Sequence, residues 1–226
     1  MNKKLLLWDI DGTIISTGQA GEVAMDNAMV SAFGRKTDLS KIDYRGRTDV
    51  WIARELLGQV DLPPTAENVH AFLEAYLAIL KEQLPLTAGT VLPGVVEILE
   101  QAANREDCVN ALLTGNLERG AKLKLSHFSA WHYFEFGAFS DDSHIRNDLA
   151  PLALKRALAK TGYDFKPENV FVIGDTPHDI ACGKIIGAKT IAVATGGYTK
   201  DELMAHKPTA YFDDFRHPEK FFELIG

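Results

Sequence analysis

Two aspartates, Asp9 and Asp11, end an apolar run that begins at Leu5. An unpaired carboxylate is costly to desolvate, so packing alone does not explain acids at the end of a buried strand. Side chains at positions i and i+2 of a strand point to the same face, and open α/β sheets bind ligands where their strands end. Gly12 then permits a tight turn, and Thr13 offers a hydroxyl. Such a cluster suits a divalent cation and a phosphate, with one carboxylate free to attack.

A second acidic pair follows another apolar run, Val170–Gly174. Asp175 ends this run and is expected to meet Asp9 across the edge of the sheet, while Asp179 is expected on the first turn of the next helix. Carboxylates gathered in this way repel one another unless Mg²⁺ holds them. The structural alternatives are an Asp-Gly turn for the first pair and a favourable helix N-terminus for Asp179, but neither explains Asp175.

The run Cys108–Leu113 closes with Thr114, Gly115 and Asn116 and leads into a helical pattern. A threonine hydroxyl together with the free N–H groups at the start of a helix forms an anion site. The alternative is a helix N-cap made by Thr or Asn, which is the commoner use of these residues in an isolated segment.

A phosphate site also needs a cation, and two candidates precede the Val170–Gly174 run. Arg146 lies just before a helical pattern, whereas Lys155 lies inside that pattern, where a solvated face is the usual place for a lysine. Because a guanidinium has planar, bidentate geometry that matches phosphate oxygens, the sequence favours Arg146 and leaves Lys155 as the second choice.

The elements that must position these residues alternate between strands and helices. Several of the apolar runs are apolar on both faces, which is typical of a parallel sheet covered by helices. The predicted strands are Leu5–Ile10, Cys108–Leu113, Val170–Gly174, Thr190–Ala194 and Ala210–Phe212. The helical patterns between them are Gly94–Ala103, Gly120–His127, Leu149–Thr161 and His178–Ile186. This alternation predicts an α/β fold with a doubly wound, Rossmann-like parallel sheet.

Residues 15–88 interrupt the alternation. They hold helical patterns at Glu22–Phe33, Val50–Leu57 and Ala66–Gln83 and no convincing strand. The sequence therefore predicts an α-helical cap domain at 15–88, inserted after the first strand of a core formed by 1–14 and 89–226. An insertion at this place lies above the carboxylates of the first strand, where it can exclude water and select substrates.

Composition limits the classes of function. The chain has 226 residues, 46% of them hydrophobic, and a formal net charge of −7, which argues against nucleic acid or an anionic membrane as the main partner. No stretch approaches the ~20 apolar residues of a membrane span, and the apolar run at the start is too short for a signal peptide. We therefore expect a cytoplasmic protein that acts on a small molecule, while its oligomeric state cannot be read from the sequence.

Taken in chain order, these motifs resemble the haloacid dehalogenase-like hydrolase superfamily. The helical insert resembles that of the subclass with an α-helical cap, which includes phosphoglycolate phosphatase and β-phosphoglucomutase. One motif departs from the family pattern, because the usual Lys-Pro is replaced by Arg146 and Asn147. The positive charge is retained.

The resemblance implies a role for each acid. Asp9 would be the nucleophile that forms an aspartyl-phosphate, and Asp11 would act first as general acid and then as general base. Asp9, the backbone carbonyl of Asp11 and Asp175 would bind Mg²⁺. The acid at position 11 favours phosphoryl transfer over carbon–halogen cleavage, since a halide leaving group needs no proton.

The resemblance also implies a phosphate site made by Thr114, Gly115, Asn116 and Arg146. Asp179 would orient these groups from behind, with Thr13 and Lys155 in supporting positions. In the insert, Arg45 and Arg47 belong to a segment similar to one in phosphoglycolate-type phosphatases. They are candidates for binding a second anionic group of the substrate, or else two solvated arginines beside a helix start.

The leading hypothesis is a Mg²⁺-dependent phosphatase of small phosphorylated metabolites, with phosphoglycolate-like compounds as candidate substrates. A sugar-phosphate mutase and an inorganic pyrophosphatase share the same motifs and remain alternatives. A phosphorylatable receiver domain needs neither the insert nor an acid at Asp11, and a catalytically inactive binding module is disfavoured by the intact acids.

Overall fold

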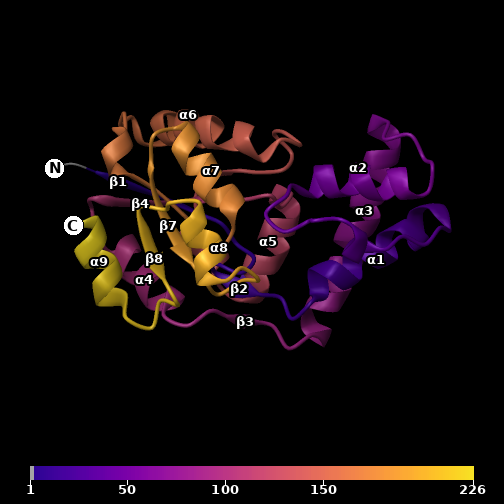
Figure 1. Ribbon diagram of the computed structural model, residues 1–226, viewed down its shortest axis with the longest axis horizontal. Coiled ribbons are helices and arrows are strands. Elements are labelled where there is room, and N and C mark those ends of the chain that lie inside the picture. The colour runs from indigo at the N-terminus through magenta and orange to yellow at the C-terminus, as the bar shows by residue number, and fades with distance from the viewer. Residues whose placement is uncertain (1–2) are drawn as a thin grey trace.

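The computed structural model describes residues 3–226 and is built around a six-stranded parallel sheet (Figure 1). The strand order is β5–β4–β1–β6–β7–β8, and every neighbouring pair is parallel. Strand β1 is therefore central, between β4 and β6. The strands are β1 (Lys4–Trp8), β4 (Cys108–Leu113), β5 (Gly137–Ala138), β6 (Val170–Gly174), β7 (Lys189–Val193) and β8 (Ala210–Phe212).

Helices cover both faces of this sheet (Figure 1). Side chains alternate along a strand, so Leu6 and Trp8 of β1 pack with the helices of one face, whereas Leu5 and Leu7 pack with those of the other. This double burial explains why β1 is apolar at successive positions. The first face carries α4 (Val95–Ala103), α5 (Glu118–His127) and α9 (Pro218–Ile225), and the second carries α6 (Leu149–Thr161) and α7 (Pro177–Ile185). A short helix, α8 (Lys200–Ala205), packs beside β7 through Leu203.

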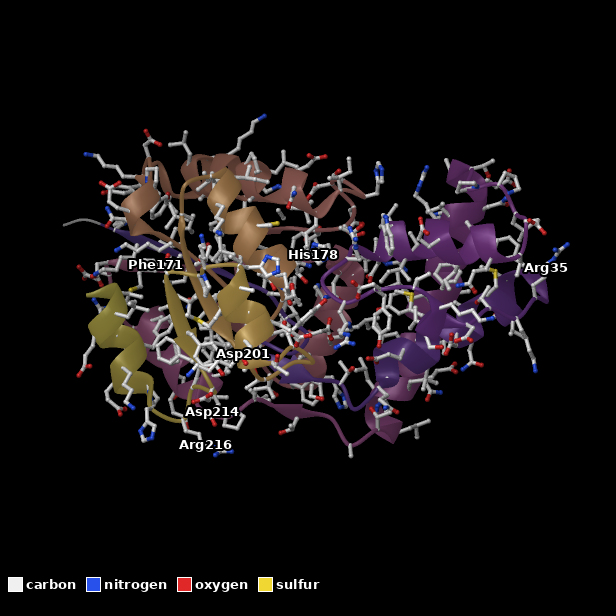
Figure 2. The ribbon with its side chains drawn as sticks, viewed as in Figure 1. Arg35, Phe171, His178, Asp201, Asp214 and Arg216 are labelled. Carbon is white, nitrogen blue, oxygen red and sulfur yellow. The ribbon has the colours of Figure 1, made fainter. Side chains whose placement is uncertain are left out.

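Three further helices lie together at the end of the molecule opposite the chain termini (Figure 1). We call α1 (Ala20–Phe33), α2 (Asp49–Gln59) and α3 (Ala66–Gln83) the helical unit. It has its own buried apolar cluster, which includes Phe72 and Leu80 of the stripe along α3. Its outer end carries Arg35 (Figure 2). The chain enters and leaves the unit through a two-stranded antiparallel sheet, β2 (Ile15–Ser16) and β3 (Thr90–Val91).

The predicted α/β sheet is confirmed, and each of the five predicted strands is present. The largest change among them is in β1, which ends at Trp8 and not at Ile10, so that Asp9 leaves the strand and enters the loop. The predicted helices begin and end within two residues of the observed ones. The elements that were not predicted are short: β2, β3 and β5 have two residues each, too few for a periodic pattern. Helices α8 and α9 were also missed.

At position 94, just before α4, both the backbone conformation and a neighbouring residue require glycine. Its φ is +78°, and an added Cβ would lie 1.6 Å from the carbonyl oxygen of Phe215. Gly162, which ends α6, has a similar φ of +67° but nothing within 4 Å of an added Cβ. Gly162→Ala thus isolates the backbone strain, while Gly94→Ala adds a clash with backbone.

We expect Gly162→Ala to lower the free energy of unfolding by about 1 kcal/mol and Gly94→Ala to lower it by about 1–3 kcal/mol more. Urea unfolding of the two variants beside the wild-type protein measures the difference. Equal losses would show that the contact with Phe215 relaxes without cost.

Candidate active site

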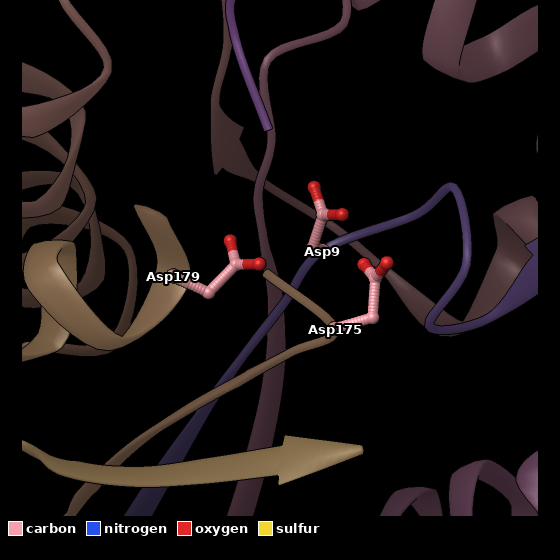
Figure 3. A group of neighbouring side chains, drawn as sticks. All are labelled: Asp9, Asp175 and Asp179. Atoms are coloured by element: carbon pink, nitrogen blue, oxygen red, sulfur yellow. The ribbon is translucent and has the colours of Figure 1, made fainter. Parts of the chain in front are cut away.

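Parallel pairing of β1 with β6 brings two acids to one edge of the sheet. Asp9 directly follows β1, Asp175 directly follows β6, and the Asp9 N–H donates to the Ile173 carbonyl oxygen at 2.9 Å. Asp179, the third residue of α7, joins them from behind (Figure 3). All three side chains are buried, and one oxygen from each lies within 4.8 Å of the others. The predicted convergence of these acids is therefore observed.

The loops around Asp175 leave little space beside it. Gly12 has a φ of +81°, as a tight turn requires, and a Cβ there would lie 2.5 Å from Asp175 Oδ2. A Cβ on Gly196 would lie 1.7 Å from the same oxygen. Thr13 donates its hydroxyl to Asp175 Oδ1 at 3.2 Å, which places it in the supporting position expected from the sequence. Both glycines are thus explained by the close approach of a carboxylate.

Arg146 is the cation nearest to these acids. It lies in a single 3₁₀ turn, Arg146–Asp148, just before α6. Its Nη2 donates to Asp9 Oδ1 at 2.9 Å and to the Asp179 carboxylate. Its buried Nε has no hydrogen-bond partner within residues 3–226. Lys155, by contrast, is exposed on α6 and does not line the cleft that lies between the strand ends and the helical unit. The structure therefore brings Arg146, and not Lys155, to the acids.

Charge at this edge is not balanced by the chain alone. Burial raises the pKa of Asp9 to about 6 despite the opposing effect of Arg146. Burial, and then the charge of Asp9, raises the pKa of Asp175 well above its usual range. One guanidinium faces three carboxylates, so the ionised cluster keeps a negative excess. Carboxylate oxygens are the ligands that Mg²⁺ prefers, and the donor set therefore fits a hard divalent cation.

The turn after β4 faces the same edge. Thr114 is buried, and its Oγ1 accepts from the Asn116 N–H at 3.3 Å and from Asn116 Nδ2 at 2.9 Å. Gly115 and Asn116 line the cleft, and a Cβ on Gly115 would lie 2.9 Å from Nη1 of Arg146. The turn and Arg146 thus flank one space.

Two of the N–H groups at the start of α5 already have partners in the chain, so they are not among the free groups that the sequence suggested. The Leu117 N–H donates to Asp49 Oδ2 at 2.8 Å, and the Glu118 N–H donates to Asp141 Oδ2 at 2.7 Å. The helix start does attract anions, as its dipole predicts, but these anions are carboxylates of the chain itself. Burial raises the pKa of Asp49 to about 7, although Lys124 and the Leu117 N–H act against that rise.

Asp11 has different surroundings from Asp9. Its side chain keeps 40% of its surface exposed, and its Oδ2 accepts from Lys124 Nζ at 2.7 Å and from Asn116 Nδ2 at 2.8 Å. Burial lowers the pKa of Lys124, but the nearby negative charges, first that of Asp11, hold it above its ordinary value. Lys124 belongs to none of the motifs that the sequence displays. A signal was available, because Lys124 falls on the same face of α5 as the buried Ala121 and Leu125.

The helical unit is docked onto the core by the segment that leads into α2. Thr48 caps α2 by accepting from the Trp51 N–H at 3.2 Å. Besides the bond that Asp49 Oδ2 accepts from the Leu117 N–H, the same segment makes four hydrogen bonds to core residues. They are Asp49 N to Gly115 O at 2.7 Å, Thr48 Oγ1 to His144 O at 2.7 Å, Val50 N to Ser140 Oγ at 2.9 Å, and Arg45 Nη1 to Gly197 O at 3.0 Å.

Between the strand ends and the helical unit lies a cleft of about 880 Å³. Asp9, Asp11, Asp175 and Arg146 line its floor, and both Arg45 and Arg47 line it from the side of the helical unit. The Arg47 guanidinium lies 4.6 Å from the centre of the Trp51 ring, and its buried Nε has no hydrogen-bond partner within the described residues. The guanidinium of Arg45 lies 5.3 Å from the centre of the Tyr198 ring.

His178 lies on the core, at the place where the segment that leads into α2 contacts it (Figure 2). A Cβ on Gly46 would lie 2.8 Å from His178 Cδ2, so the docked segment passes directly over the start of α7. Burial, and then Arg47, lowers the pKa of His178, which favours the neutral ring.

Comparison with known proteins agrees with this fold. Residues 6–193 match the family model described as haloacid dehalogenase-like hydrolase. "Probable phosphatase IndB" of Dickeya dadantii (strain 3937) is 31% identical over 94% of this chain and 90% of its own length. A phosphoglycolate phosphatase of Pseudomonas fluorescens (strain Pf0-1) is 25% identical over 94% and 77%, and the pyrophosphatase PpaX of Bacillus cereus (strain Q1) is 27% identical over 94% and 93%.

Among solved structures, a hydrolase from Pseudomonas syringae superimposes with a TM-score of 0.76 over 99% of this chain and 100% of that one. At 19% identity, this likeness concerns the fold. The family model covers most of the chain, and the chain therefore belongs to the haloacid dehalogenase-like hydrolase family. The resemblance drawn from the motifs is confirmed at this level.

Gly115 lies directly against the docked segment. A Cβ there would lie 2.0 Å from the Arg47 carbonyl oxygen, whereas a Cβ on Gly120 of α5 would meet nothing nearer than Leu77 Cδ2 at 3.5 Å. Gly115→Ala should therefore weaken docking, with Gly120→Ala as the matched control. Overpacking of about 1–3 kcal/mol makes amide exchange in residues 44–50 faster by roughly tenfold to a hundredfold. Hydrogen-exchange mass spectrometry measures this, and unchanged exchange would refute the contact as a docking constraint.

The pKa of Asp49 gives a dependence of stability on pH. The folded protein binds the proton more tightly than the unfolded chain, whose pKa is near 3.8, so this contribution to stability falls as pH rises from about 4 to about 7 and is then constant. Asp49→Asn removes the titration and keeps an oxygen for the Leu117 N–H. Relative to that variant, the wild-type protein should lose roughly 2 kcal/mol between pH 5 and pH 7. Urea unfolding of both proteins at each pH tests this, and parallel curves would contradict it.

Proposed function

We propose that this protein is a Mg²⁺-dependent phosphatase that hydrolyses small phosphorylated metabolites through an aspartyl-phosphate. The observation that carries the proposal is the convergence of Asp9, Asp11 and Asp175 with Arg146 on the floor of one cleft. Membership of the hydrolase family and the relatives named as phosphatases support it.

In the first half-reaction, an oxygen of Asp9 attacks phosphorus and the bond from phosphorus to the leaving oxygen breaks. The electron pair of that bond goes to the leaving oxygen, which takes a proton from Asp11. Arg146 donates to Oδ1 of Asp9, and no residue from 3 to 226 donates to Oδ2, so Oδ2 is the oxygen we assign to attack.

In the second half-reaction, Asp11 takes a proton from water as the water oxygen attacks phosphorus. The bond from phosphorus to Asp9 breaks, its electron pair returns to the carboxylate, and phosphate leaves. Asp11 ends protonated, as it began. The two acids divide the work because their environments differ: Asp9 is buried against Arg146, whereas Asp11 stays partly exposed beside Lys124.

Asp9, Asp175 and the backbone carbonyl of Asp11 would hold Mg²⁺, with Asp179 at the edge of the same group. When bound, the cation supplies positive charge that offsets the repulsion between the carboxylates and an anionic phosphate. Asp179 accepts from the Thr176 N–H at 3.0 Å and from Arg146, and we assign it the role of orienting the guanidinium.

The transferring phosphate would lie between the Thr114–Gly115–Asn116 turn and Arg146. Two observations support this assignment: Nε of Arg146 has no hydrogen-bond partner within residues 3–226, and its Nη1 lies beside Gly115. Thr114 shapes the turn by accepting from Asn116, and its hydroxyl hydrogen, which no residue from 3 to 226 accepts, is left to donate to the phosphate. Charge-assisted hydrogen bonds from a guanidinium are the strongest that the chain offers a phosphate here.

We further propose that residues 15–88 act as a cap domain that chooses the substrate, with Arg45 and Arg47 as candidates for a second anionic group. Phosphoglycolate-like substrates agree with that charge. Inorganic pyrophosphate is a second candidate, favoured by the pyrophosphatase among the relatives. Cytoplasmic location stays a prediction. Within residues 3–226, the structure holds no helix with the length and apolar character that crossing a membrane requires.

Asp9→Asn should remove the nucleophile and lower turnover of p-nitrophenyl phosphate by at least about a thousandfold in the presence of Mg²⁺. Asp164→Asn, at an exposed aspartate, is the matched control and should retain wild-type turnover. Chelation should abolish the wild-type activity and added Mg²⁺ should restore it. Wild-type turnover by the Asp9→Asn variant would refute the assignment of Asp9 as nucleophile.

A screen that includes phosphoglycolate, pyrophosphate and hexose phosphates separates phosphatase from pyrophosphatase and mutase.

A further inference from the structure

Lys124 is an unusual residue in this fold. Lysines are almost never buried unless paired, yet the Lys124 side chain is only 5% exposed. It extends from the core-facing side of α5, and its Nζ donates to Asp11 Oδ2 and to Asn116 Oδ1, both at 2.7 Å. None of the family motifs identified in the sequence contains it.

The contacts of Lys124 distinguish the two oxygens of Asp11. Oδ2 accepts from both Lys124 Nζ and Asn116 Nδ2, at 2.7 and 2.8 Å. Oδ1 accepts no hydrogen bond from any residue between 3 and 226, and the side chain remains open to the cleft. One oxygen of Asp11 is therefore anchored, and the other is free to meet a ligand.

Lys124 also sets the orientation of Asn116. Because its ammonium group can only donate, the Asn116 oxygen must face Lys124, and the amide nitrogen then faces Asp11 and Thr114. Asn116 is thus oriented from both sides, by Lys124 at its oxygen and by Asp11 and Thr114 at its nitrogen. Loss of the ammonium group removes one of the two donors to Asp11 Oδ2 and leaves the Asn116 oxygen without its partner.

We propose that Lys124 is a positioning residue that anchors Asp11 by Oδ2 and thereby assigns proton transfer to Oδ1. The inference rests on the proposed phosphatase function. Oδ1 gives its proton to the leaving oxygen as the ester bond breaks, and later takes a proton from the water that attacks phosphorus. Lys124 gains and loses no proton in either step. Anchoring matters because displacing a catalytic group by 1 Å can cost about a hundredfold in rate.

The test uses two substrates that differ in their need for a general acid. p-Nitrophenolate can leave without a proton, whereas the oxygen of an alkyl phosphate must be protonated as it leaves. The value of kcat/KM reports the chemistry up to departure of the leaving group. Lys124→Met should therefore lower kcat/KM by about a hundredfold for glycerol 3-phosphate, or for the alkyl phosphate that the wild-type protein hydrolyses fastest, and by less than about fivefold for p-nitrophenyl phosphate. Lys122→Met, on the exposed side of the same helix, should change neither value.

A double-mutant cycle separates positioning from a purely structural role. If Lys124 acts through Asp11, adding Lys124→Met to Asp11→Asn should lower kcat/KM for the alkyl phosphate by less than about twofold. Lys124→Gln is measured in the same cycle, so that poor folding of the methionine variant, seen in its thermal unfolding, does not decide the result.

Equal losses on both substrates, or additive losses in the Asp11→Asn background, would overturn the proposal and indicate a structural or phosphate-binding lysine. Failure of the proposed function looks different. In that case the wild-type protein would hydrolyse neither substrate, and both proposals would fall together.

Discussion

Parallel pairing of neighbouring strands holds several carboxylates close together at one edge of the sheet, and the surrounding structure is arranged around their negative charge. Because β1 and β6 are adjacent and end at the same edge, Asp9 and Asp175 cannot separate without breaking the centre of the sheet. Asp179 adds a third acid from α7. Burial raises the pKa of Asp9 and of Asp175, and the nearby like charges add to that rise. A cluster of buried carboxylates does not stabilise the fold, so its presence in a well-packed core points to function.

The neighbouring residues are those that such a cluster requires. Gly12 and Gly196 make room for the Asp175 carboxylate, and Arg146 offsets part of the charge from a turn outside the sheet. The helical unit then covers the edge through the segment that contacts Gly115. Covering the acids removes water from around them, and electrostatic interactions become stronger in a medium of lower dielectric constant. The docked segment and the acids are thus parts of one electrostatic arrangement.

Local signals explain what the sequence could predict. Strands β1, β4 and β6 are mostly apolar, with Lys4 at the start of β1 and Asn110 inside β4 as exceptions, and an acid or hydroxyl directly after each strand stands out against that background. The α3 stripe has a clear helical period. Strand β5 and helix α9 were missed, the first because two residues carry no period, and the second because its apolar positions follow a polar stretch at the end of the chain. Lys155 was retained as an alternative because sequence order does not reveal which face of α6 it occupies.

Residues whose role depends on contact between distant segments were harder to find. Asp49 looks like an ordinary charged residue at a helix start and becomes notable only through its contact with Leu117 at the start of α5. Lys124 shows only its place on the buried face of α5, and its role becomes visible through its contacts with Asp11 and Asn116. The core itself surrounds the two acids of the first motif with different partners: a guanidinium and two further carboxylates around Asp9, and an ammonium and an amide around Asp11. Two residues apart in the chain, the acids lie in unlike fields. That difference allows one to serve as nucleophile and the other to carry a proton, which identical surroundings would prevent.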